Sequence, residues 1–186
     1  MNSSLDRSGE MTAVIGSGGE RLRFEALCLP YRTDLLRFVF WLCRDRALAE
    51  DVVQEALLRA WRSFDSLADE TAARSWLLTI ARRELARTFE RRRLETVDID
   101  DLAEPASEAV AVNDPHEVLE MRRAILQLDL IYREPLMLQV LFGYSTQEIA
   151  QQLQINVGAV LTRLYRARES LRSRMLRDAA DSRPCP

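Results

Sequence analysis

Arginine is concentrated in two segments of this chain, and an acidic segment separates them. Residues Arg74–Arg93 hold seven Arg and two Glu, and residues Val157–Arg177 hold six Arg and one Glu. The stretch from Glu95 to Glu120 holds nine Asp or Glu and neither Lys nor Arg. Two positive segments on an anionic tether predict a protein that grips a polyanion at two separated places. The alternative is that both segments are ordinary solvated helix faces.

The first arginine-rich segment, RSWLLTIARRELARTFERRR, places an aromatic ring among its arginines. Its inward side, if it is wound as a helix, carries Leu77, Leu78, Ala81, Leu85 and Phe89. Trp76, Arg83 and Arg87 share the other side, where a base can stack on the indole while guanidinium groups hold phosphates. The alternative places Trp76 at the edge of the core. Residues Phe64–Ala73, just before Arg74, predict a surface loop that can form a pocket for an unstacked base.

The second arginine-rich segment completes a helix-turn-helix pattern. Ser145 and Glu148 are spaced as a capping box, and Asn156 can cap the following helix after a short turn. The inner stripe of that helix is Val160, Leu164, Ala167, Leu171 and Met175. Its outward face carries Gly158, Ala159, Thr162, Arg163, Tyr165, Arg166 and Arg168. Small residues permit close approach to DNA, and Arg and Thr can bond base edges, so the pattern favours DNA binding over a plain helical hairpin.

The segment LAEDVVQEALLRAW predicts an amphipathic helix over Leu48–Trp61. Its buried stripe is Ala49, Val52, Val53, Ala56, Leu57, Ala60 and Trp61. Its opposite face offers Asp51, Gln54, Glu55, Leu58 and Arg59. A charged face with an apolar centre is either a solvated surface with one exposed leucine or a docking surface for a partner.

These elements predict an all-α protein: two small helical domains joined by a flexible acidic linker, the second containing the helix-turn-helix. No segment shows the alternation that is typical of a strand. The expected divisions are a disordered N-terminal tail over 1–19, a first domain over 20–94, the linker over 95–117, a second domain over 118–177 and a C-terminal tail over 178–186. Asp114 is the expected N-cap of the helix that opens the second domain.

Composition argues against catalysis and against a general nucleic-acid coat protein. The net charge is −3 and the pI is about 5.4, so the positive charge is local. Cys28, Cys43 and Cys185 form no CxxC pair, and His116 is the one histidine, so we expect no structural zinc site, no other metal and no cofactor. Without a Gly-rich phosphate loop or a nucleophile–base set we expect no enzyme. No signal peptide or membrane span is visible, which predicts a cytoplasmic protein without membrane insertion.

Two blocks of motifs, taken together, resemble one family. AEDVVQEALLRAW and F…RSWLLTIAR, followed by GYSTQEIAQQLQINVGAVLTRLYRARESLR, are similar to the extracytoplasmic-function (ECF) group of bacterial RNA polymerase sigma factors. The resemblance covers about Phe24–Arg93 and Val118–Arg172, in the family's order. It implies an alternative sigma factor that binds core RNA polymerase and directs initiation at chosen promoters. It also implies control by an anti-sigma factor, often membrane-anchored in this group.

The resemblance implies three sets of contact residues. Asp51, Gln54, Glu55, Leu58, Arg59 and Trp61 would dock on core polymerase. Phe64, Arg74, Trp76, Arg83 and Arg87 would bind the melted −10 promoter element. Gly158, Ala159, Thr162, Arg163, Tyr165 and Arg166 would bind the duplex −35 element.

The chain departs from the family's usual pattern at several of these positions. Arg83 stands where Asn is usual, an Asp is usual near the position of Arg87, and Gln154 stands where the turn commonly has Gly. One rival function is a self-sufficient helix-turn-helix regulator, which would dimerise to bind two half-sites. The first domain shows no self-pairing heptad seam, so we expect a monomer when free. A second rival is a helical adaptor that binds only proteins.

The expected role of Arg166 can be tested directly. Arg166→Ala should weaken discrimination of the −35 element by about 1–3 kcal/mol, because a contact to a base edge is lost. Competition between a cognate promoter and a −35-substituted one, measured with polymerase present, reports this quantity. Unchanged selectivity would count against the assignment.

Overall fold

Every element formed by the described residues is a helix, which confirms the predicted all-α fold. The computed structural model describes the backbone of residues 8–95 and 116–181, and the side chains of residues 18–93 and 118–177. The α-helices are α1 Ser8–Cys28, α2 Arg32–Cys43, α3 Arg46–Arg62, α4 Ala73–Glu95, α5 His116–Leu126, α6 Leu130–Phe142, α7 Thr146–Leu153 and α8 Val157–Asp181. Short 3-10 helices lie at Leu29–Tyr31, Phe64–Ser66 and Glu70–Ala72.

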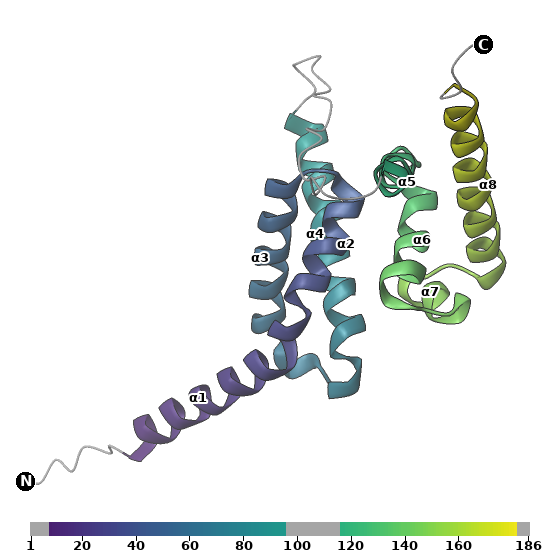
Figure 1. The fold of residues 1–186 in the computed structure, drawn as a ribbon. Coiled ribbons are helices and arrows are strands. Elements are labelled where there is room, and N and C mark those ends of the chain that lie inside the picture. The colour runs from purple at the N-terminus through teal and green to yellow at the C-terminus, as the bar shows by residue number, and fades with distance from the viewer. Residues whose placement is uncertain (1–7, 96–115, 182–186) are drawn as a thin grey trace, which may run out of the picture.

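The helices form two groups that lie side by side (Figure 1). In the N-terminal group α2, α3 and α4 stand next to one another, and α1 runs away from one end. In the C-terminal group α6, α7 and α8 pack against one another, and α5 packs against α8. Helix α2 packs against α6 across the boundary, so the two groups are in direct contact. None of the described helices is long and apolar enough to cross a lipid bilayer.

Apolar stripes recurring three and four residues apart hold the N-terminal group together. α2 buries Leu35, Phe38, Val39 and Leu42; α4 buries Leu77, Leu78, Ala81 and Leu85. α3 buries Ala49, Val52, Val53, Ala56 and Ala60, as its sequence predicts. Trp61 differs from that prediction. It is 37% exposed because it ends the stripe with its ring edge against Phe24, at 5.2 Å between ring centroids.

The ends of the elements differ from the predicted domain boundaries. α1 already begins at Ser8, within the predicted disordered tail 1–19. Its C-terminal turns are anchored by buried Phe24 and Cys28, and a helix extends from an anchored turn more readily than it nucleates. The predicted linker 95–117 overlaps α4 and α5 by its first and last residues. Its residues 96–115, including the expected N-cap Asp114, lie outside the described residues.

The helix-turn-helix has the caps that the sequence predicts. The Glu148 N–H donates to Ser145 Oγ at 3.3 Å, and the Ser145 N–H donates to Glu148 Oε2 at 2.7 Å. The Ser145 hydroxyl and N–H hold the pKa of Glu148 below its ordinary value. Asn156 caps α8 by accepting the Ala159 N–H at 2.7 Å. The predicted inner stripe of α8 is buried at Val160, Leu164 and Ala167 and half-buried at Leu171 and Met175.

The turn between α7 and α8 is strained at one position. Gln154 has φ 55° and ψ 43°, which is the left-handed helical region. A side chain with a Cβ is disfavoured there by about 1–2 kcal/mol, whereas glycine adopts this conformation freely. The Gly that is usual at this turn would relieve the strain.

Gln154→Gly is therefore expected to raise the free energy of unfolding by about 0.5–1 kcal/mol. Relief of the left-handed strain outweighs the extra freedom that glycine gives the unfolded chain. Urea unfolding followed by circular dichroism measures the difference. Gln151→Gly is the matched control, because Gln151 is exposed inside α7 and should lose about 1 kcal/mol. A Gln154→Gly protein no more stable than the wild type would contradict this account.

Candidate nucleic-acid and partner surfaces

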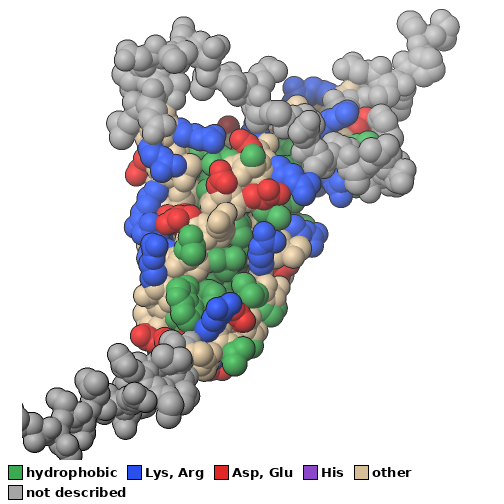
Figure 2. Space-filling model, turned by 90° about the vertical axis from the view of Figure 1, so that its left-hand side faces the viewer, with side chains coloured by type: hydrophobic (Ala, Val, Ile, Leu, Met, Phe, Trp, Pro, Cys, Tyr) green, Lys and Arg blue, Asp and Glu red, His purple; other side chains and the backbone are tan. Residues whose placement is uncertain are grey.

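The predicted docking residues lie together on the outer face of α3. Asp51, Gln54, Leu58 and Arg59 are exposed, and Glu55 is half-buried. Asp45 fixes the start of this helix by accepting the Leu48 N–H at 3.0 Å. Seen from the α3 side, hydrophobic side chains reach the surface among charges of both signs (Figure 2). This mixture suits contact with another protein better than contact with nucleic acid.

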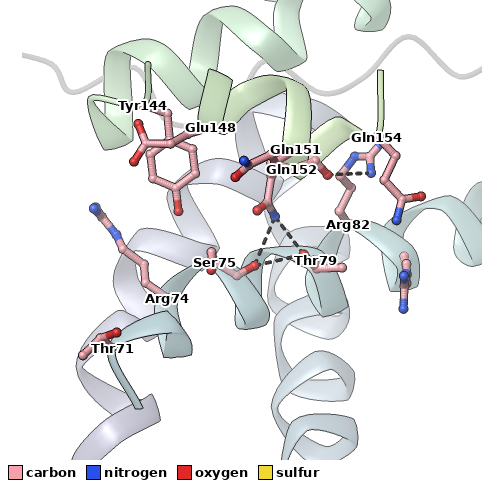
Figure 3. Close-up of a pocket in the computed structure, with 11 residues that line it drawn as sticks. Thr71, Arg74, Ser75, Thr79, Arg82, Tyr144, Glu148, Gln151, Gln152 and Gln154 are labelled. Atoms are coloured by element: carbon pink, nitrogen blue, oxygen red, sulfur yellow. Dashed lines mark hydrogen bonds between the residues drawn. The ribbon is translucent and has the colours of Figure 1, made fainter. Parts of the chain in front are cut away.

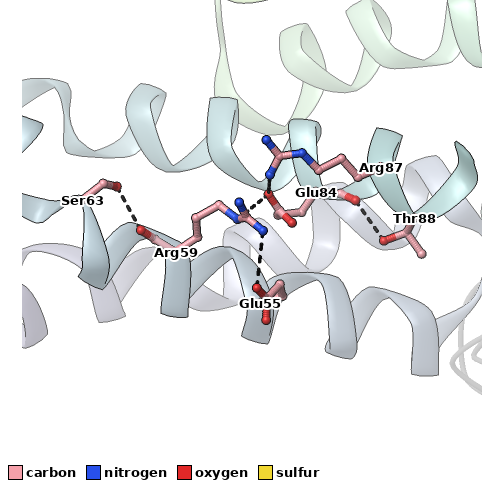
Figure 4. A network of polar contacts seen from close by, with 6 residues as sticks. All are labelled: Glu55, Arg59, Ser63, Glu84, Arg87 and Thr88. Carbon is pink, nitrogen blue, oxygen red and sulfur yellow. Dashed lines mark hydrogen bonds and ion pairs between the residues drawn. The ribbon is translucent and has the colours of Figure 1, made fainter. Parts of the chain in front are cut away.

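A buried carboxylate that the sequence analysis did not single out lies behind this face. Glu84 of α4 is 5% exposed, and its Oε1 accepts Arg59 Nε at 2.7 Å and Arg87 Nη1 at 2.6 Å (Figure 4). Arg59 also lies 3.6 Å from Glu55. One acidic side chain thus joins a predicted docking residue to a predicted −10 contact. The signal available in the sequence was a Glu three residues before Arg87, on the side of the helix that carries its neighbour Leu85 toward the core.

The structure does not support the predicted DNA contact by Phe64. The ring is 5% exposed and meets Phe24 edge to face at 5.3 Å between centroids, and the Arg23 guanidinium lies 5.6 Å from its centroid. The apolar ring gains more from burial against α1 than a loop position can offer. The predicted loop 64–73 is formed largely by two 3-10 turns, so Phe64 begins a compact corner rather than an open pocket.

The other predicted −10 residues lie in different surroundings along α4. Arg83 and Arg87 are exposed, while Trp76 is half-buried and packs against the core, as in the alternative weighed for it. Arg74 faces the C-terminal group. It pairs with Asp34 at 3.0 Å, and its guanidinium lies 4.6 Å from the centroid of the Phe142 ring.

Helix α7 lies over part of α4, and the two helices line a partly open polar pocket of about 460 Å³ between the two groups (Figure 3). Gln152 Nε2 donates to the Ser75 carbonyl at 3.1 Å and to Thr79 Oγ1 at 3.0 Å. Arg82 Nε pairs with Glu134 Oε1 at 2.5 Å and its Nη1 donates to the Gln152 carbonyl at 3.4 Å. The helix-turn-helix therefore covers the N-terminal part of the α4 surface in this arrangement.

Arginines that are buried or half-buried make further contacts between the groups. Arg133 is 3% exposed and donates to the carbonyls of Leu42 at 2.9 Å and Leu126 at 2.5 Å, while Arg44 donates to the Leu128 carbonyl at 3.3 Å. Burial, with the Arg44 charge, lowers the pKa of Arg133 to about 10, so it stays protonated at pH 7. The side-chain atoms left buried without a hydrogen-bond partner among the described residues are Nε of Arg44, Arg74 and Arg133. All three arginines make contacts across the boundary between the groups. Burial of their unpaired Nε atoms therefore reduces the free energy gained when the two groups come together.

The predicted −35 residues share the outward face of α8. Gly158, Thr162, Tyr165 and Arg166 are exposed, and Ala159 and Arg163 are half-buried. Thr162 Oγ1 donates to the Gly158 carbonyl at 2.9 Å, and Arg166 Nη1 donates to the Tyr132 hydroxyl at 3.2 Å. These contacts orient the side chains while leaving the face open. Two turns of small, hydroxyl and arginine residues fit a major groove.

The described part of the chain shows no arrangement for metal or thiol chemistry. No three His, Cys, Asp or Glu side chains gather there as metal ligands do. Burial raises the pKa of the Cys28 thiol to about 11 and raises that of Cys43 as well, so both stay protonated. Cys185 lies outside the described residues.

Comparison with known proteins matches both halves of the chain to one family. Residues 27–95 match the family model for Sigma-70 region 2, and residues 119–171 match that for Sigma-70, region 4. The ECF RNA polymerase sigma factor SigX of Bacillus subtilis is 30% identical over 161 residues, covering 82% of this chain and 83% of that protein. The ECF RNA polymerase sigma factor SigL of Mycobacterium tuberculosis is 34% identical over 167 residues, covering 87% and 94%.

Two solved structures have a fold similar to that of this chain. The sigma factor RpoE from Bartonella quintana, in its co-crystal structure with the anti-sigma factor NepR, matches with a TM-score of 0.71 at 27% identity, covering 79% of this chain and 92% of that chain. CnrH in complex with the cytosolic domain of CnrY matches with a TM-score of 0.61 at 24% identity, covering 91% and 96%. The second match bears on the fold alone.

The burial of Phe64 leads to a prediction about stability. Phe64→Ala should lower the free energy of unfolding by about 3–5 kcal/mol, because a packed aromatic ring is replaced by a cavity. Tyr165→Ala is the control. Its side chain is 67% exposed, and its removal should change stability by less than about 0.5 kcal/mol. Denaturant unfolding of both variants measures this, and equal losses would refute the assignment of Phe64 to the core.

Proposed function

The chain belongs to the ECF group of RNA polymerase sigma factors and is an alternative sigma factor; from that membership we propose how its two helix groups divide the work. The N-terminal group, residues 20–94, acts as sigma domain 2. Its α3 face, with Asp51, Leu58 and Arg59 exposed, docks on core polymerase. Its α4 surface holds the melted −10 element through Trp76, Arg83 and Arg87. The half-buried Trp76 ring stacks on a base, and the exposed guanidinium groups of Arg83 and Arg87 contact phosphates.

The C-terminal group, residues 118–177, acts as sigma domain 4 and binds the duplex −35 element. Its α8 enters the major groove with Gly158 and Ala159 at the close approach. Thr162 and Arg166 bond base edges, and Arg163 and Tyr165 contact the backbone. The observation that carries this proposal is the open, capped face of α8 directly after a helix-turn-helix bend.

In the structure the two helix groups are in direct contact, which we call the closed arrangement. We infer that the closed arrangement is not the one that binds a promoter. The −10 and −35 elements lie roughly 25 base pairs apart, or about 85 Å along the duplex. Two groups in direct contact do not span that distance. Gln152 and Arg82 also tie α7 to the part of α4 beside Trp76. Core polymerase would hold the groups apart, and the free chain would bind promoter DNA weakly.

An anti-sigma factor is the proposed regulator. The similar sigma factor from Bartonella quintana was solved with an anti-sigma factor, and this chain exposes Leu58 by 45% and Trp61 by 37% at its α3 face. A protein that covers these side chains would block the surface proposed for polymerase. We also propose, as a separate point, that this regulator is anchored in the membrane. The chain itself is proposed to act in the cytoplasm as a monomer without cofactor or metal.

Reconstituted transcription tests the proposed function. The chain should associate with core RNA polymerase and, on a random promoter library, start transcription at sites sharing −35 and −10 sequences that core polymerase alone does not select. Failure to associate, or association without any change in start sites, would remove the proposal. A stable free dimer with tight promoter binding would favour the self-sufficient regulator instead.

Weakening the contacts that hold the groups in the closed arrangement should expose the α4 surface. Gln152→Ala removes two hydrogen bonds between the groups, each worth about 1 kcal/mol, and should raise the affinity of the free chain for single-stranded −10 DNA by roughly ten- to thirtyfold. Fluorescence anisotropy with a labelled non-template strand measures the affinity. Gln147→Ala, at an exposed position of the same helix, is the control and should leave it unchanged. An unaltered affinity in Gln152→Ala would mean that α7 does not mask this surface.

A further inference from the structure

One buried carboxylate stands between the two surfaces proposed for the N-terminal group. Glu84 is the one buried acidic side chain among the described residues, and both of its ion-pair partners are arginines. Arg59 comes from the α3 face and Arg87 from the exposed side of α4. Their guanidinium groups meet at a single atom, Oε1 of Glu84.

These contacts lie in a groove on the surface of the N-terminal group. A groove of about 480 Å³ runs between α3 and α4 and has Asp51, Glu55 and Arg59 on one wall. The other wall includes Glu84, Arg87 and Thr88. Arg59 and Arg87 keep side-chain exposures of 44% and 55%, against 6% for Glu84. The carboxylate is thus a rigid inner anchor, while both guanidinium groups keep donors on the outside.

Anchoring changes what these arginines can do. A free arginine side chain samples many rotamers and loses that freedom when it binds a ligand. A guanidinium has five N–H donors, so one held by Glu84 through a single nitrogen can still bond a phosphate or a partner carboxylate. Because a buried carboxylate is strongly destabilising without a cation, Glu84 in turn holds its arginines firmly.

We propose that Glu84 is a positioning residue that holds Arg59 in place for core polymerase and Arg87 in place for the −10 strand. The proposal rests on the function proposed above and adds a residue that touches neither ligand. It also predicts a distinctive direction for the change in DNA affinity. Removal of a negative charge beside bound DNA ordinarily strengthens binding, whereas loss of an anchor weakens it.

The test uses the complete chain bound to core polymerase. Glu84→Gln keeps the shape of the side chain and removes its charge, and it should lower affinity for the labelled non-template strand of a promoter recovered from the random library by about three- to tenfold. Arg87→Ala should lower this affinity by a similar factor. The double variant Glu84→Gln/Arg87→Ala should lower it no further than either single variant. Glu90→Gln makes the same charge change at an exposed site on α4 and should leave affinity unchanged or slightly higher.

Affinity for core polymerase supplies a second readout. Glu84→Gln and Arg59→Met should both weaken it, while Arg59→Met should leave −10 binding within about twofold because Glu84 still holds Arg87. Glu84→Asp, which retracts the carboxylate by one methylene group, should act like Glu84→Gln if the latter fails to fold. Stronger or unchanged −10 binding in the Glu84 variants, or losses that add in the double variant, would overturn the proposal. A wild-type chain that does not bind polymerase would instead refute the proposed function on which it rests.

Discussion

Helix α2 has to bury apolar residues on more than one side, and both groups of helices take their positions from it. Its sequence RTDLLRFVFWLC is apolar over most of its circumference, so no single neighbour can cover it. α3 and α4 cover part of it within the N-terminal group, and α6 covers another part. The Phe38 ring, fully buried, meets Phe142 edge to face at 5.6 Å between centroids. Closing the two groups together thus follows from burial of α2.

Polar contacts around that apolar centre set how firmly the groups are closed. Gln152, Arg82 and Arg133 make specific bonds across the boundary, but three arginines leave a buried Nε without a partner among the described residues. Each such nitrogen loses hydration without full compensation, which reduces the net stability of the closed form. An interface of this kind separates at moderate cost when another protein offers better partners.

The N-terminal group carries two different kinds of surface on adjacent helices. α3 presents a mixed polar and apolar face suited to a protein partner, and α4 presents arginines suited to phosphate. The two helices share an apolar core, which fixes their spacing, and the buried Glu84 carboxylate, which fixes the side chains that emerge on either side. Glu84 therefore contacts one arginine from each of the two surfaces.

Sequence alone determined what depends on neighbouring residues. Helical periodicity predicted the core stripes of α3 and α8, the Ser145–Glu148 box and the Asn156 cap predicted the helix-turn-helix, and ordered motifs indicated the family. These features depend on contacts within a few residues, which a linear pattern records. Tertiary structure alone decided the surroundings of Phe64, Arg74 and Glu84, because their partners lie at Phe24, Phe142 and Arg59, distant in the chain. The same holds for the closure of the two groups, since no local pattern states which helix will cover the remaining apolar side of α2.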